Sequence, residues 1–247
     1  AGLDKDAACI DGLAAMGFGF LEVGTVTPLP QDGNAKPRMF RLKDKQALIN
    51  RMGFNNQGVD PMCKRVRRSK FNGVLGINIG KNTTTSVGDA LADYIFCMRK
   101  VYKQASYVAV NISSPNSPGL RDLQKESELA TLIEGLKQEH EALKEKFGKH
   151  VPLVVKIAPD MDDEDMTNLA RRLLSFELDG VIVSNTTVSR GAVAGERHAI
   201  QSGGLSGAPL RSQANHALSL VSNEVKGKMA VIGVGGIVKG EDAAEKI

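Results

Sequence analysis

Polar side chains recur at one kind of place in this sequence, the ends of short apolar runs. In chain order these positions are Thr25, Asn78, Asn111, Lys156, Asn185-Thr186 and Gly235-Gly236. Asn and Lys are poor strand residues, so their repeated placement there is a signal. Carboxamides both donate and accept hydrogen bonds, so several amides around one lysine suit a planar, polar, anionic ligand whose ring alternates C=O and N–H. Glycoside hydrolysis fits badly, because it needs two facing carboxylates.

Plainer interpretations of these residues remain open. Each Asn could cap the following helix or close a turn. Lys156 could be a lysine whose stem is buried while its charge reaches water. The neighbours of Lys156, Val154-Val155 and Ile157-Ala158, are those of a fully buried strand, which favours a charge placed inside the site.

Two glycine segments and two polar loops add to this set. Gly203–Gly207 precedes a helix that starts near Pro209, and Gly233–Gly236 ends an apolar run. Backbone N–H groups at such turns and at helix N-termini bind phosphate. A simple tight turn would explain the GxGG segment equally well on its own, but its position after the last apolar run, where barrels place a phosphate site, favours phosphate. The stretch Asn50–Asn56 is expected to be a loop, and Asn111–Asn116 is expected to run directly off a strand into a loop. Loops that follow buried strands often carry catalytic groups.

The elements that must position these residues are strands alternating with helices. The apolar runs are nearly continuous in Val, Ile and Leu, as in parallel strands buried on both faces: Phe20–Val26, Val74–Ile79, Tyr107–Ile112, Leu153–Ala158, Gly180–Val183 and Met229–Val234. Between them, apolar stripes predict one helix around 122–147, with Leu129, Leu132, Ile133, Leu136, Leu143 and Phe147, and a second with Met166, Leu169, Ala170, Leu173 and Leu174.

This alternation predicts an α/β protein with a parallel sheet. The length of 247 residues is close to the roughly 250 of a (β/α)8 TIM barrel, in which active sites lie at the carboxyl ends of the strands. We expect a single barrel domain over 1–247, truncated at both ends. It would lack most of strand 1, with Ala1-Gly2 as its end, together with strand 8. A doubly wound sheet is the rival architecture.

Composition and charge exclude several other classes. The net charge is only +4 and there is no Trp, which argues against a nucleic-acid binder. The three cysteines are far apart with no CxxC, and the four histidines share no ligand spacing, so we expect neither a disulfide framework nor a metal site. No apolar run approaches the ~18 residues of a membrane helix. The basic run Lys64–Lys70 is expected to be a solvated helix face.

Taken together, these segments resemble dihydroorotate dehydrogenase. The resemblance covers nearly the whole chain in order, through Ala1–Asp6, Asn50–Phe54, Gly76–Gly80, Asn111–Asn116, Lys156, Asn185-Thr186, Gly203–Gly207 and Gly233–Gly236. Ser114 stands where cytosolic relatives carry Cys, so the chain is similar to the class 2, quinone-linked branch. The resemblance implies oxidation of dihydroorotate to orotate in pyrimidine biosynthesis, with FMN in a (β/α)8 barrel.

The resemblance also implies roles for single residues. Flavin contacts are expected from Ala1, Gly2, Leu3, Asp4, Lys5, Thr25, Asn78, Asn111, Lys156 and Ser184, with Gly207 and Gly236 at the phosphate end. Orotate contacts are expected from Lys5, Asn50, Arg51, Met52, Gly53, Phe54, Asn111, Asn116, Asn185 and Thr186. Ser114 would be the base that removes the C5 proton, aided by a relay in which Thr25 or Thr186 could take part. Lys156 would be the second catalytic residue, the electrostatic partner of the reduced flavin.

The partners follow from the same resemblance. The electron acceptor would be a quinone. Peripheral contact with the inner membrane, on its cytoplasmic side in a bacterium, would come from an N-terminal helical segment that is absent here. Two other readings remain: a phosphate-binding barrel lyase or isomerase that uses Lys156 as a Schiff-base nucleophile, and a ligand-binding barrel without catalysis.

Overall fold

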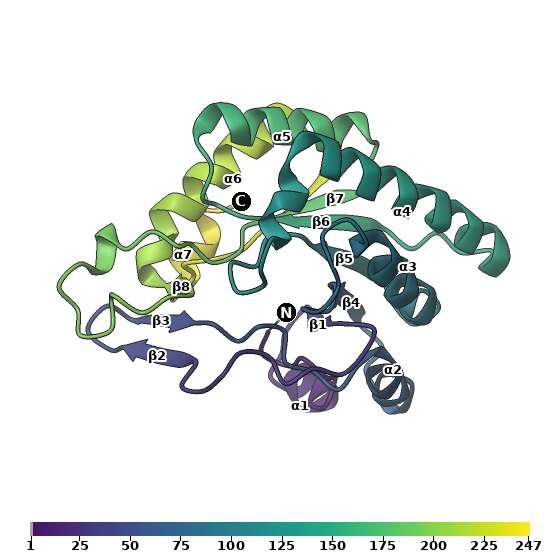
Figure 1. Ribbon diagram of the computed structural model, residues 1–247, viewed down its shortest axis with the longest axis horizontal. Coiled ribbons are helices and arrows are strands. Elements are labelled where there is room, and N and C mark those ends of the chain that lie inside the picture. Colours follow the sequence, from purple (N-terminus) through teal and green to yellow (C-terminus); the bar gives the residue numbers. More distant parts are fainter. Residues whose placement is uncertain (1) are drawn as a thin grey trace. The chain divides into compact units, whose positions relative to one another are not determined.

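The computed structural model describes residues 2–247, so the part of the strand-end prediction that falls on Ala1 lies outside the described residues. The chain forms two compact units. The first unit comprises residues 1–33, 53–111 and 125–154, and the second comprises residues 34–52, 112–124 and 155–247. Each is described separately below, and Figure 1 labels most of their helices and strands.

The first unit is built on parallel strands with helices between them. β1 (Phe20–Val26), β4 (Val74–Ile79) and β5 (Tyr107–Asn111) are neighbours in that order. The register pairs Phe20 with Val74 and Gly76 with Tyr107. The helices are α1 (Ile10–Ala15), α2 (Val59–Arg68), α3 (Ala90–Val101) and α4 (Glu126–Phe147). β6 (Leu153–Ile157) begins in this unit and ends in the second.

In the second unit the parallel order continues from β6 to β7 (Gly180–Val183) and β9 (Ala230–Gly233). β7 and β9 pair in register from Gly180 with Ala230 to Val183 with Gly233. α5 (Asp163–Ser175) packs against α6 (Arg211–Val225), and α7 (Gly240–Ala244) closes the chain. Short 3-10 turns lie at η1 (Leu120–Gln124), η2 (Gly191–Val193) and η3 (Ala208–Leu210).

A small antiparallel sheet in the second unit was not predicted. Its strand order is β2 (Met39–Leu42), β3 (Ala47–Asn50) and β8 (Gly204–Gly207). β2 and β3 alternate buried with more exposed residues, as expected for a sheet with one face on a core. That core contains Phe40, Leu42, Ala47, Ile49, Val193, Ala199 and Leu205. The three strands have only four residues each, too few for a periodic signal to stand out in the sequence.

The α/β prediction is confirmed, and all six predicted strands are present within one residue at either end. The complete eight-stranded barrel and its single domain stay predictions. Two predictions of local structure were wrong. Gly204–Gly207 is a strand rather than a turn, and Asn50 ends a strand rather than lying in a loop. No strand forms among the described residues before Phe20, so the strand end expected at Gly2 is not seen.

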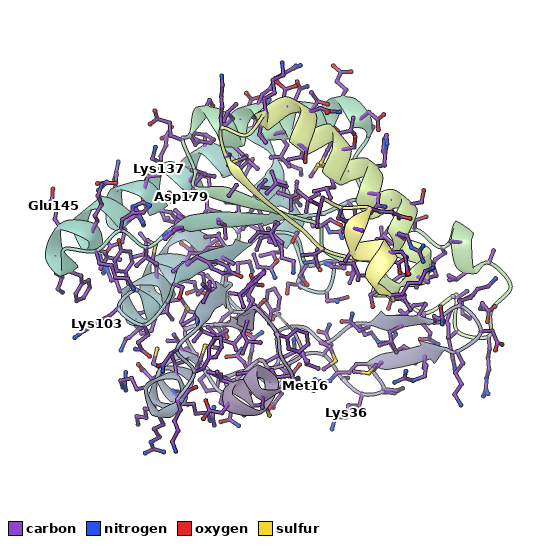
Figure 2. The ribbon with its side chains drawn as sticks, turned by 180° about the vertical axis from the view of Figure 1, so that it is seen from behind. Met16, Lys36, Lys103, Lys137, Glu145 and Asp179 are labelled. Atoms are coloured by element: carbon purple, nitrogen blue, oxygen red, sulfur yellow. The ribbon has the colours of Figure 1, made fainter. Side chains whose placement is uncertain are left out.

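The predicted apolar stripe of α4 is buried at Leu129, Leu132, Ile133, Leu136 and Leu143. Phe147 departs from it: its side chain is 37% exposed and stacks on Tyr102, with ring centroids 5.9 Å apart. The outer side of α4 carries charged residues such as Lys137 and Glu145, which Figure 2 labels. The basic run on α2 is largely solvated, as predicted, with Lys64, Arg67 and Arg68 exposed.

The thiols are free at all three cysteines, in line with the expected lack of a disulfide framework. Burial raises the pKa of Cys63 and of Cys97, so both thiols stay protonated near neutral pH. Within residues 2–247, no helix combines the length and apolarity that crossing a bilayer requires.

A buried carboxylate fixes the end of the second unit. Asp242 is fully buried, and its Oδ2 accepts hydrogen bonds from the amides of Val238 (2.8 Å) and Lys239 (3.0 Å). Its Oδ1 lies 2.8 Å from Arg211 Nη1. The hydrogen bond from the Val238 amide is the main reason why the pKa of Asp242 lies below its usual value. The carboxylate thereby joins the loop before α7 to the start of α6.

Asp242→Asn should therefore lower the Tm by a few degrees at pH 7, with the loss shrinking in acid. A depressed folded-state pKa adds stability above the unfolded value of about 3.9, and this stability is lost as pH falls through the folded-state value. Thermal melts of parent and variant between pH 7 and about 3 measure the difference in Tm between the two proteins. Glu241→Gln, an exposed neighbour, is the matched control. A Tm difference that stays constant over that pH range would contradict the stabilising role of the ionised Asp242 carboxylate.

Candidate active site

In the first unit, three predicted residues meet at the carboxyl ends of neighbouring strands. The Thr25 hydroxyl donates to Asn78 Oδ1 at 2.5 Å, and Asn111 Nδ2 donates to Thr25 Oγ1 at 2.9 Å. Their relative exposures are 3%, 0% and 4% for Thr25, Asn78 and Asn111. The predicted gathering of these amides is confirmed for this unit, and their mutual hydrogen bonds replace the water that burial removes.

A carboxylate and a tyrosine extend the same network. Asn78 Nδ2 donates to Glu22 Oε1 at 3.1 Å, and the Tyr107 hydroxyl donates to Glu22 Oε2 at 3.0 Å. Burial and the nearby Glu22 raise the pKa of Tyr107, so its hydroxyl remains a donor. Glu22 and Tyr107 were not predicted as site residues. Together they fix the orientation of the Asn78 amide.

The N-terminal turn lies against the same strand end. Gly2 N donates to Gly24 O at 2.7 Å, and Gly24 N donates to Asp4 O at 2.9 Å. The Asp4 carboxylate accepts from the amides of Ala8 (2.9 Å) and Cys9 (2.8 Å), which holds the turn in shape. A Cβ on Gly24, whose φ is +110°, would stand 2.4 Å from Asn78 O, so this strand approach requires glycine.

The Gly53-Phe54 pair has an unusual backbone. Both residues are left-handed, with φ of 72° and 53°. The Gly53 carbonyl accepts from Gln31 Nε2 at 2.9 Å, and the Phe54 carbonyl accepts from Asn56 Nδ2 at 2.7 Å. These side-chain bonds support a conformation that an aromatic residue rarely adopts. The Phe54 side chain is buried, at 6% exposure.

In the second unit, Lys156 lies inside β6 with 8% exposure, and all five residues of that strand are buried. Among residues 2–247, its ammonium has no hydrogen-bonding or ion-pairing partner. A cation buried in this way is costly unless a negative or strongly dipolar group compensates for it. The lysine is therefore suited to an anionic ligand.

Two of the predicted orotate-binding amides also pair in the second unit. Asn116 Nδ2 donates to Asn50 Oδ1 at 3.3 Å. Asn185 Nδ2 donates to Ser113 Oγ at 2.9 Å, and its Oδ1 accepts from the Thr186 amide at 2.8 Å. Arg51 instead contacts Gln201 Oε1 at 2.9 Å and lies 4.6 Å above the Phe40 ring. Its side chain thus supports the 201–202 loop.

The predicted base is buried, and two other buried hydroxyl groups lie in the same unit. Ser114 is 6% exposed, and its Oγ accepts a hydrogen bond from the Asn116 amide at 3.3 Å. The hydroxyl oxygens of Ser117 and Thr186 are buried without a hydrogen-bond partner among the described residues. Thr186 was a predicted relay member, whereas Ser117 was missed. The sequence gives no sign that Ser117 becomes a buried hydroxyl two residues after Pro115.

Close contacts account for Gly203 and Gly204 in the 203–207 segment. A Cβ on Gly204 would lie 1.8 Å from Thr186 Oγ1 and 3.2 Å from Pro115 Cγ. A Cβ on Gly203 would lie 2.2 Å from Asn50 O. The glycines therefore let β8 approach the segments that carry Asn50, Pro115 and Thr186.

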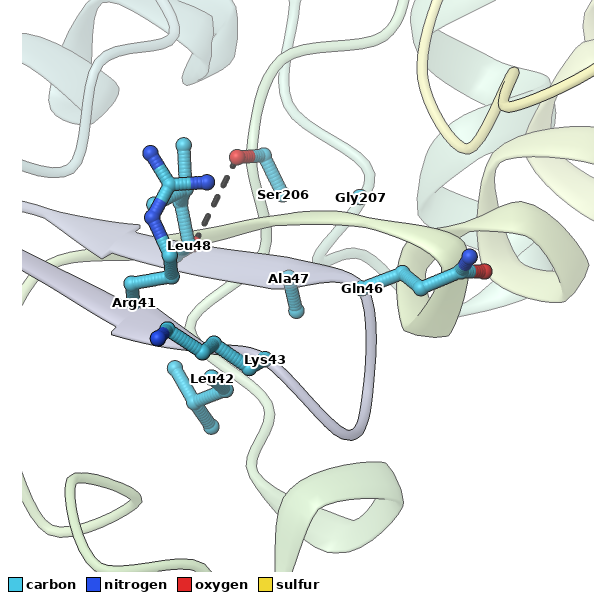
Figure 3. A pocket seen from close by; sticks show the side chains of 8 residues that line it. All are labelled: Arg41, Leu42, Lys43, Gln46, Ala47, Leu48, Ser206 and Gly207. Atoms are coloured by element: carbon cyan, nitrogen blue, oxygen red, sulfur yellow. Dashed lines mark hydrogen bonds between the residues drawn. The ribbon is translucent and has the colours of Figure 1, made fainter.

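The predicted phosphate-end glycines also have tight neighbours. Gly207 has φ of +99°, and a Cβ on it would lie 2.2 Å from Gln46 O. It lines a cavity of about 400 Å³ with Arg41, Leu42, Lys43, Gln46, Ala47, Leu48 and Ser206 (Figure 3). A Cβ on Gly236 would lie 2.4 Å from Arg211 Cα. Both positions need glycine for packing, and their phosphate role stays a prediction.

The interpretation that the strand-end asparagines cap helices is wrong. The N-caps of α3, α4 and α5 are Asp89, Lys125 and Asp162. The Asn185 carboxamide oxygen accepts a hydrogen bond from the amide of the next residue, Thr186. Ser184 donates to Asn185 O at 3.0 Å and is buried.

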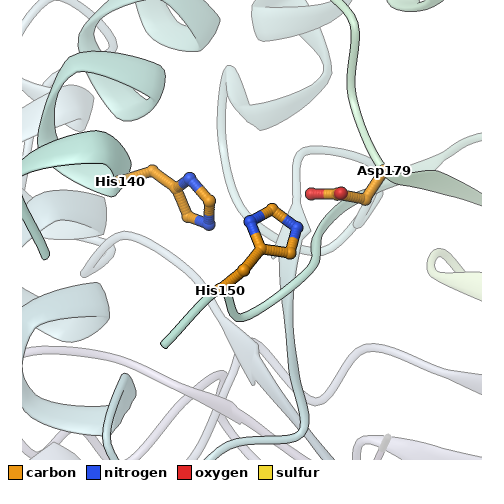
Figure 4. Close-up of side chains that lie close together, drawn as sticks. All are labelled: His140, His150 and Asp179. Atoms are coloured by element: carbon orange, nitrogen blue, oxygen red, sulfur yellow. The ribbon is translucent and has the colours of Figure 1, made fainter. Parts of the chain in front are cut away.

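Two histidines that are ten residues apart lie together in the first unit. The His140 and His150 rings meet edge to face with centroids 5.1 Å apart (Figure 4). His140 Nε2 donates to the Val151 carbonyl at 2.7 Å. Spacing along the sequence did not reveal this pair, because His140 lies on the buried face of α4 and His150 follows in a loop.

Comparisons with known proteins decide the family. A family model described as dihydroorotate dehydrogenase matches residues 1–247. The chain belongs to the dihydroorotate dehydrogenase family. It is 56% identical over 247 residues to dihydroorotate dehydrogenase (quinone) of Chromobacterium violaceum, covering 100% of this chain and 72% of that protein. It is 54% identical to the Azotobacter vinelandii protein of the same description, covering 71% of it.

A solved structure agrees. The crystal structure of DHODH from Eimeria tenella in complex with ferulenol matches with a TM-score of 0.93 and 39% identity, covering 100% of this chain and 71% of that one. The resemblance drawn from the motifs is thereby confirmed at the level of the family. The roles of single residues stay predictions.

Gly204→Ala should destabilise the second unit, because the new Cβ would collide with Thr186 Oγ1. Overpacking of this kind costs about 1–3 kcal/mol, and each kcal/mol lowers the Tm of a 150–250-residue domain by roughly 2–4 °C. Gly191→Ala is the matched control, since a Cβ there meets nothing within 4 Å. Thermal melts give the Tm of each variant. Equal Tm values would contradict the prediction and show that the 203–207 segment shifts to accommodate the new Cβ without loss of stability.

Proposed function

We propose that this chain oxidises dihydroorotate to orotate with FMN as its cofactor and a quinone as the final electron acceptor. The family match supports the reaction, and the name shared by the bacterial relatives supports the quinone. The family match also favours this oxidoreductase over a lyase or isomerase that uses Lys156. The proposed fold is the (β/α)8 barrel that the resemblance to this family implies.

The buried polar groups fit a flavin. Thr25, Asn78 and Asn111 form a fixed set of donors and acceptors in the first unit, suited to the heteroatoms of a planar ring. Lys156 is a buried cation without a protein counter-ion among residues 2–247. This lysine is the single observation that carries the cofactor assignment, because a flavin ring system gains negative charge on reduction.

Residue roles follow from these surroundings. We assign flavin contacts to Gly2–Lys5, Thr25, Asn78, Asn111, Lys156 and Ser184, and the phosphate end to Gly207 and Gly236. Ala1, which lies outside the described residues, completes that set by resemblance. We assign orotate contacts to Lys5, Asn50, Gly53, Phe54, Asn111, Asn116, Asn185 and Thr186, together with the backbones of Arg51 and Met52.

The reaction removes a proton from C5 of the substrate and a hydride from C6, leaving a C5=C6 double bond. Bound FMN supplies the hydride acceptor. Ser114 accepts the C5 proton and passes its own hydroxyl proton to a neighbouring group. The buried, unpartnered hydroxyls of Thr186 and Ser117 are the candidates for that group in the second unit. The paired amides of Asn50 and Asn116 hold the ring of the substrate.

The function is tested by anaerobic mixing of the flavin-loaded enzyme with dihydroorotate. Loss of flavin absorbance together with formation of orotate is the expected result. A flavin that stays oxidised while the protein is folded would contradict the proposal. The membrane assignment is tested separately, by cosedimentation of the enzyme with vesicles and its turnover with a soluble quinone.

Ser114→Ala should reduce the rate of flavin reduction by about 10²–10⁴, the usual contribution of a general base. Flavin content should be unchanged, because the side chain is assigned to the substrate. Ser114→Cys should keep part of the activity and shift the pH profile downward, since a thiol ionises near 8.5. Stopped-flow reduction across pH 6–10, a range chosen around that thiol pKa, measures both variants. If Ser114→Ala keeps the parental rate, Ser114 is only a turn residue before Pro115.

Lys156→Ala should slow flavin reduction more than it weakens orotate binding, because its charge matters most as the flavin becomes negative. Lys156→Arg should rescue only part of the rate, since a planar fork does not replace a compact ammonium. Single-turnover kinetics and orotate titration separate the two effects. Parental reduction rates in Lys156→Ala would remove the lysine from the mechanism.

A further inference from the structure

Arg121 links three separate segments of the second unit. It lies on η1 with its side chain 24% exposed. Its Nε donates to the Ser113 carbonyl at 3.0 Å, and its Nη2 donates to the Thr186 carbonyl at 3.0 Å. Its Nη1 donates to Asp160 Oδ2 at 2.8 Å. All three guanidinium nitrogens therefore have an acceptor, each from a different loop.

The carboxylate of Asp160 is itself held from several sides. It accepts from the Thr187 hydroxyl, from the Val188 amide at 3.0 Å and from Gln213 Nε2 at 3.1 Å. Its side chain is only 12% exposed. A partly buried, hydrogen-bonded ion pair of this kind defines a geometry much better than an exposed one. Asp160 thus fixes the plane in which the guanidinium lies.

The two carbonyls that Arg121 contacts belong to segments already assigned to the substrate. Ser113 directly precedes Ser114, the proposed base, and Thr186 directly follows Asn185. A further bond ties the same segments, from Asn185 Nδ2 to Ser113 Oγ at 2.9 Å. Gln124, on the same 3-10 turn as Arg121, accepts from the Ala158 amide at 3.0 Å, two residues after Lys156.

We propose that Arg121, oriented by Asp160, is a positioning residue for removal of the C5 proton. By holding the carbonyls of Ser113 and Thr186 in one plane, it sets the distance between the Ser114 hydroxyl and the substrate ring bound at Asn185. The inference rests on the proposed function. It also explains why arginine is needed: a single ammonium cannot donate along three fixed directions of a planar fork.

The test uses the FMN-loaded enzyme and four variants. Arg121→Ala and Arg121→Lys remove the fork, and Arg171→Ala and Arg171→Lys are matched controls. Arg171 makes a similar pair with Glu224 at 3.0 Å, but its side chain is 60% exposed on α5. Three readouts are compared: the rate of flavin reduction by dihydroorotate with hydrogen or deuterium at C5, the recovery of that rate with millimolar guanidinium, and the backbone hydrogen exchange of residues 113–117 and 185–188.

Arg121→Ala should lose about 10²-fold in the reduction rate, the scale of a misplacement near 1 Å. Its deuterium isotope effect at C5 should exceed that of the parent, because proton removal becomes the slow step. Guanidinium should restore part of the rate, and exchange should accelerate in both segments. Arg121→Lys should be impaired nearly as much, and the Arg171 controls should match the parent in every readout.

A parental rate in Arg121→Ala would overturn the inference while leaving the proposed function intact. The inference also fails if the rate falls only in proportion to lost flavin, with no change in isotope effect, rescue or exchange. If the parent itself fails to reduce its flavin, the proposed function fails first and this inference with it. In that case faster exchange in Arg121→Ala would still show that Arg121 orders the two segments.

Discussion

A polar side chain that is buried loses its hydrogen bonds to water. The polar side chains at the ends of β1, β4 and β5 are organised by the need to replace those hydrogen bonds. Asn78 cannot be fully buried beside β1 unless both ends of its amide are satisfied, and Thr25 and Glu22 satisfy them. Each partner then requires its own partner, so the orientation of one amide is transmitted to Asn111 and Tyr107. Such a chain is rigid, because turning one member would leave another unsatisfied. Rigidity of this kind is what a ring-binding surface requires.

Lys156 is the exception among these buried polar groups, and this exception points to a ligand. Every other buried polar group discussed in the two units either has a protein partner or is a small hydroxyl, whereas the lysine has a full charge. Folding tolerates that cost at one position of an otherwise apolar strand. The stability lost there is compatible with a site whose ligand brings the missing charge.

The parallel strands could be predicted because they are buried on both faces and read as continuous apolar runs. The strand ends could be predicted because Asn and Lys interrupt those runs. The antiparallel sheet could not, since β8 reads Gly-Leu-Ser-Gly and its pairing with β3 depends on residues far away in the chain. Tertiary packing determined these elements, and the sequence did not reveal that glycines of the 203–207 segment make close contacts with Asn50 and Gln46. For the same reason the three hydrogen bonds of the Arg121 guanidinium could not be predicted, because their acceptors come from residues 113, 160 and 186.

The pairing of β3 with β8 has a consequence for how the protein is made. Ala47 pairs with Gly207, so 207 − 47 = 160 residues must be synthesised between the two partners. At about 5–20 residues per second, a ribosome needs roughly 8–32 s for that stretch. During this time the apolar face of the β2–β3 hairpin, with Phe40 and Ile49, has none of its final cover from Val193, Ala199 and Leu205. The hairpin is thus a segment of the nascent chain that needs protection from aggregation, although its apolar face is buried in the folded protein.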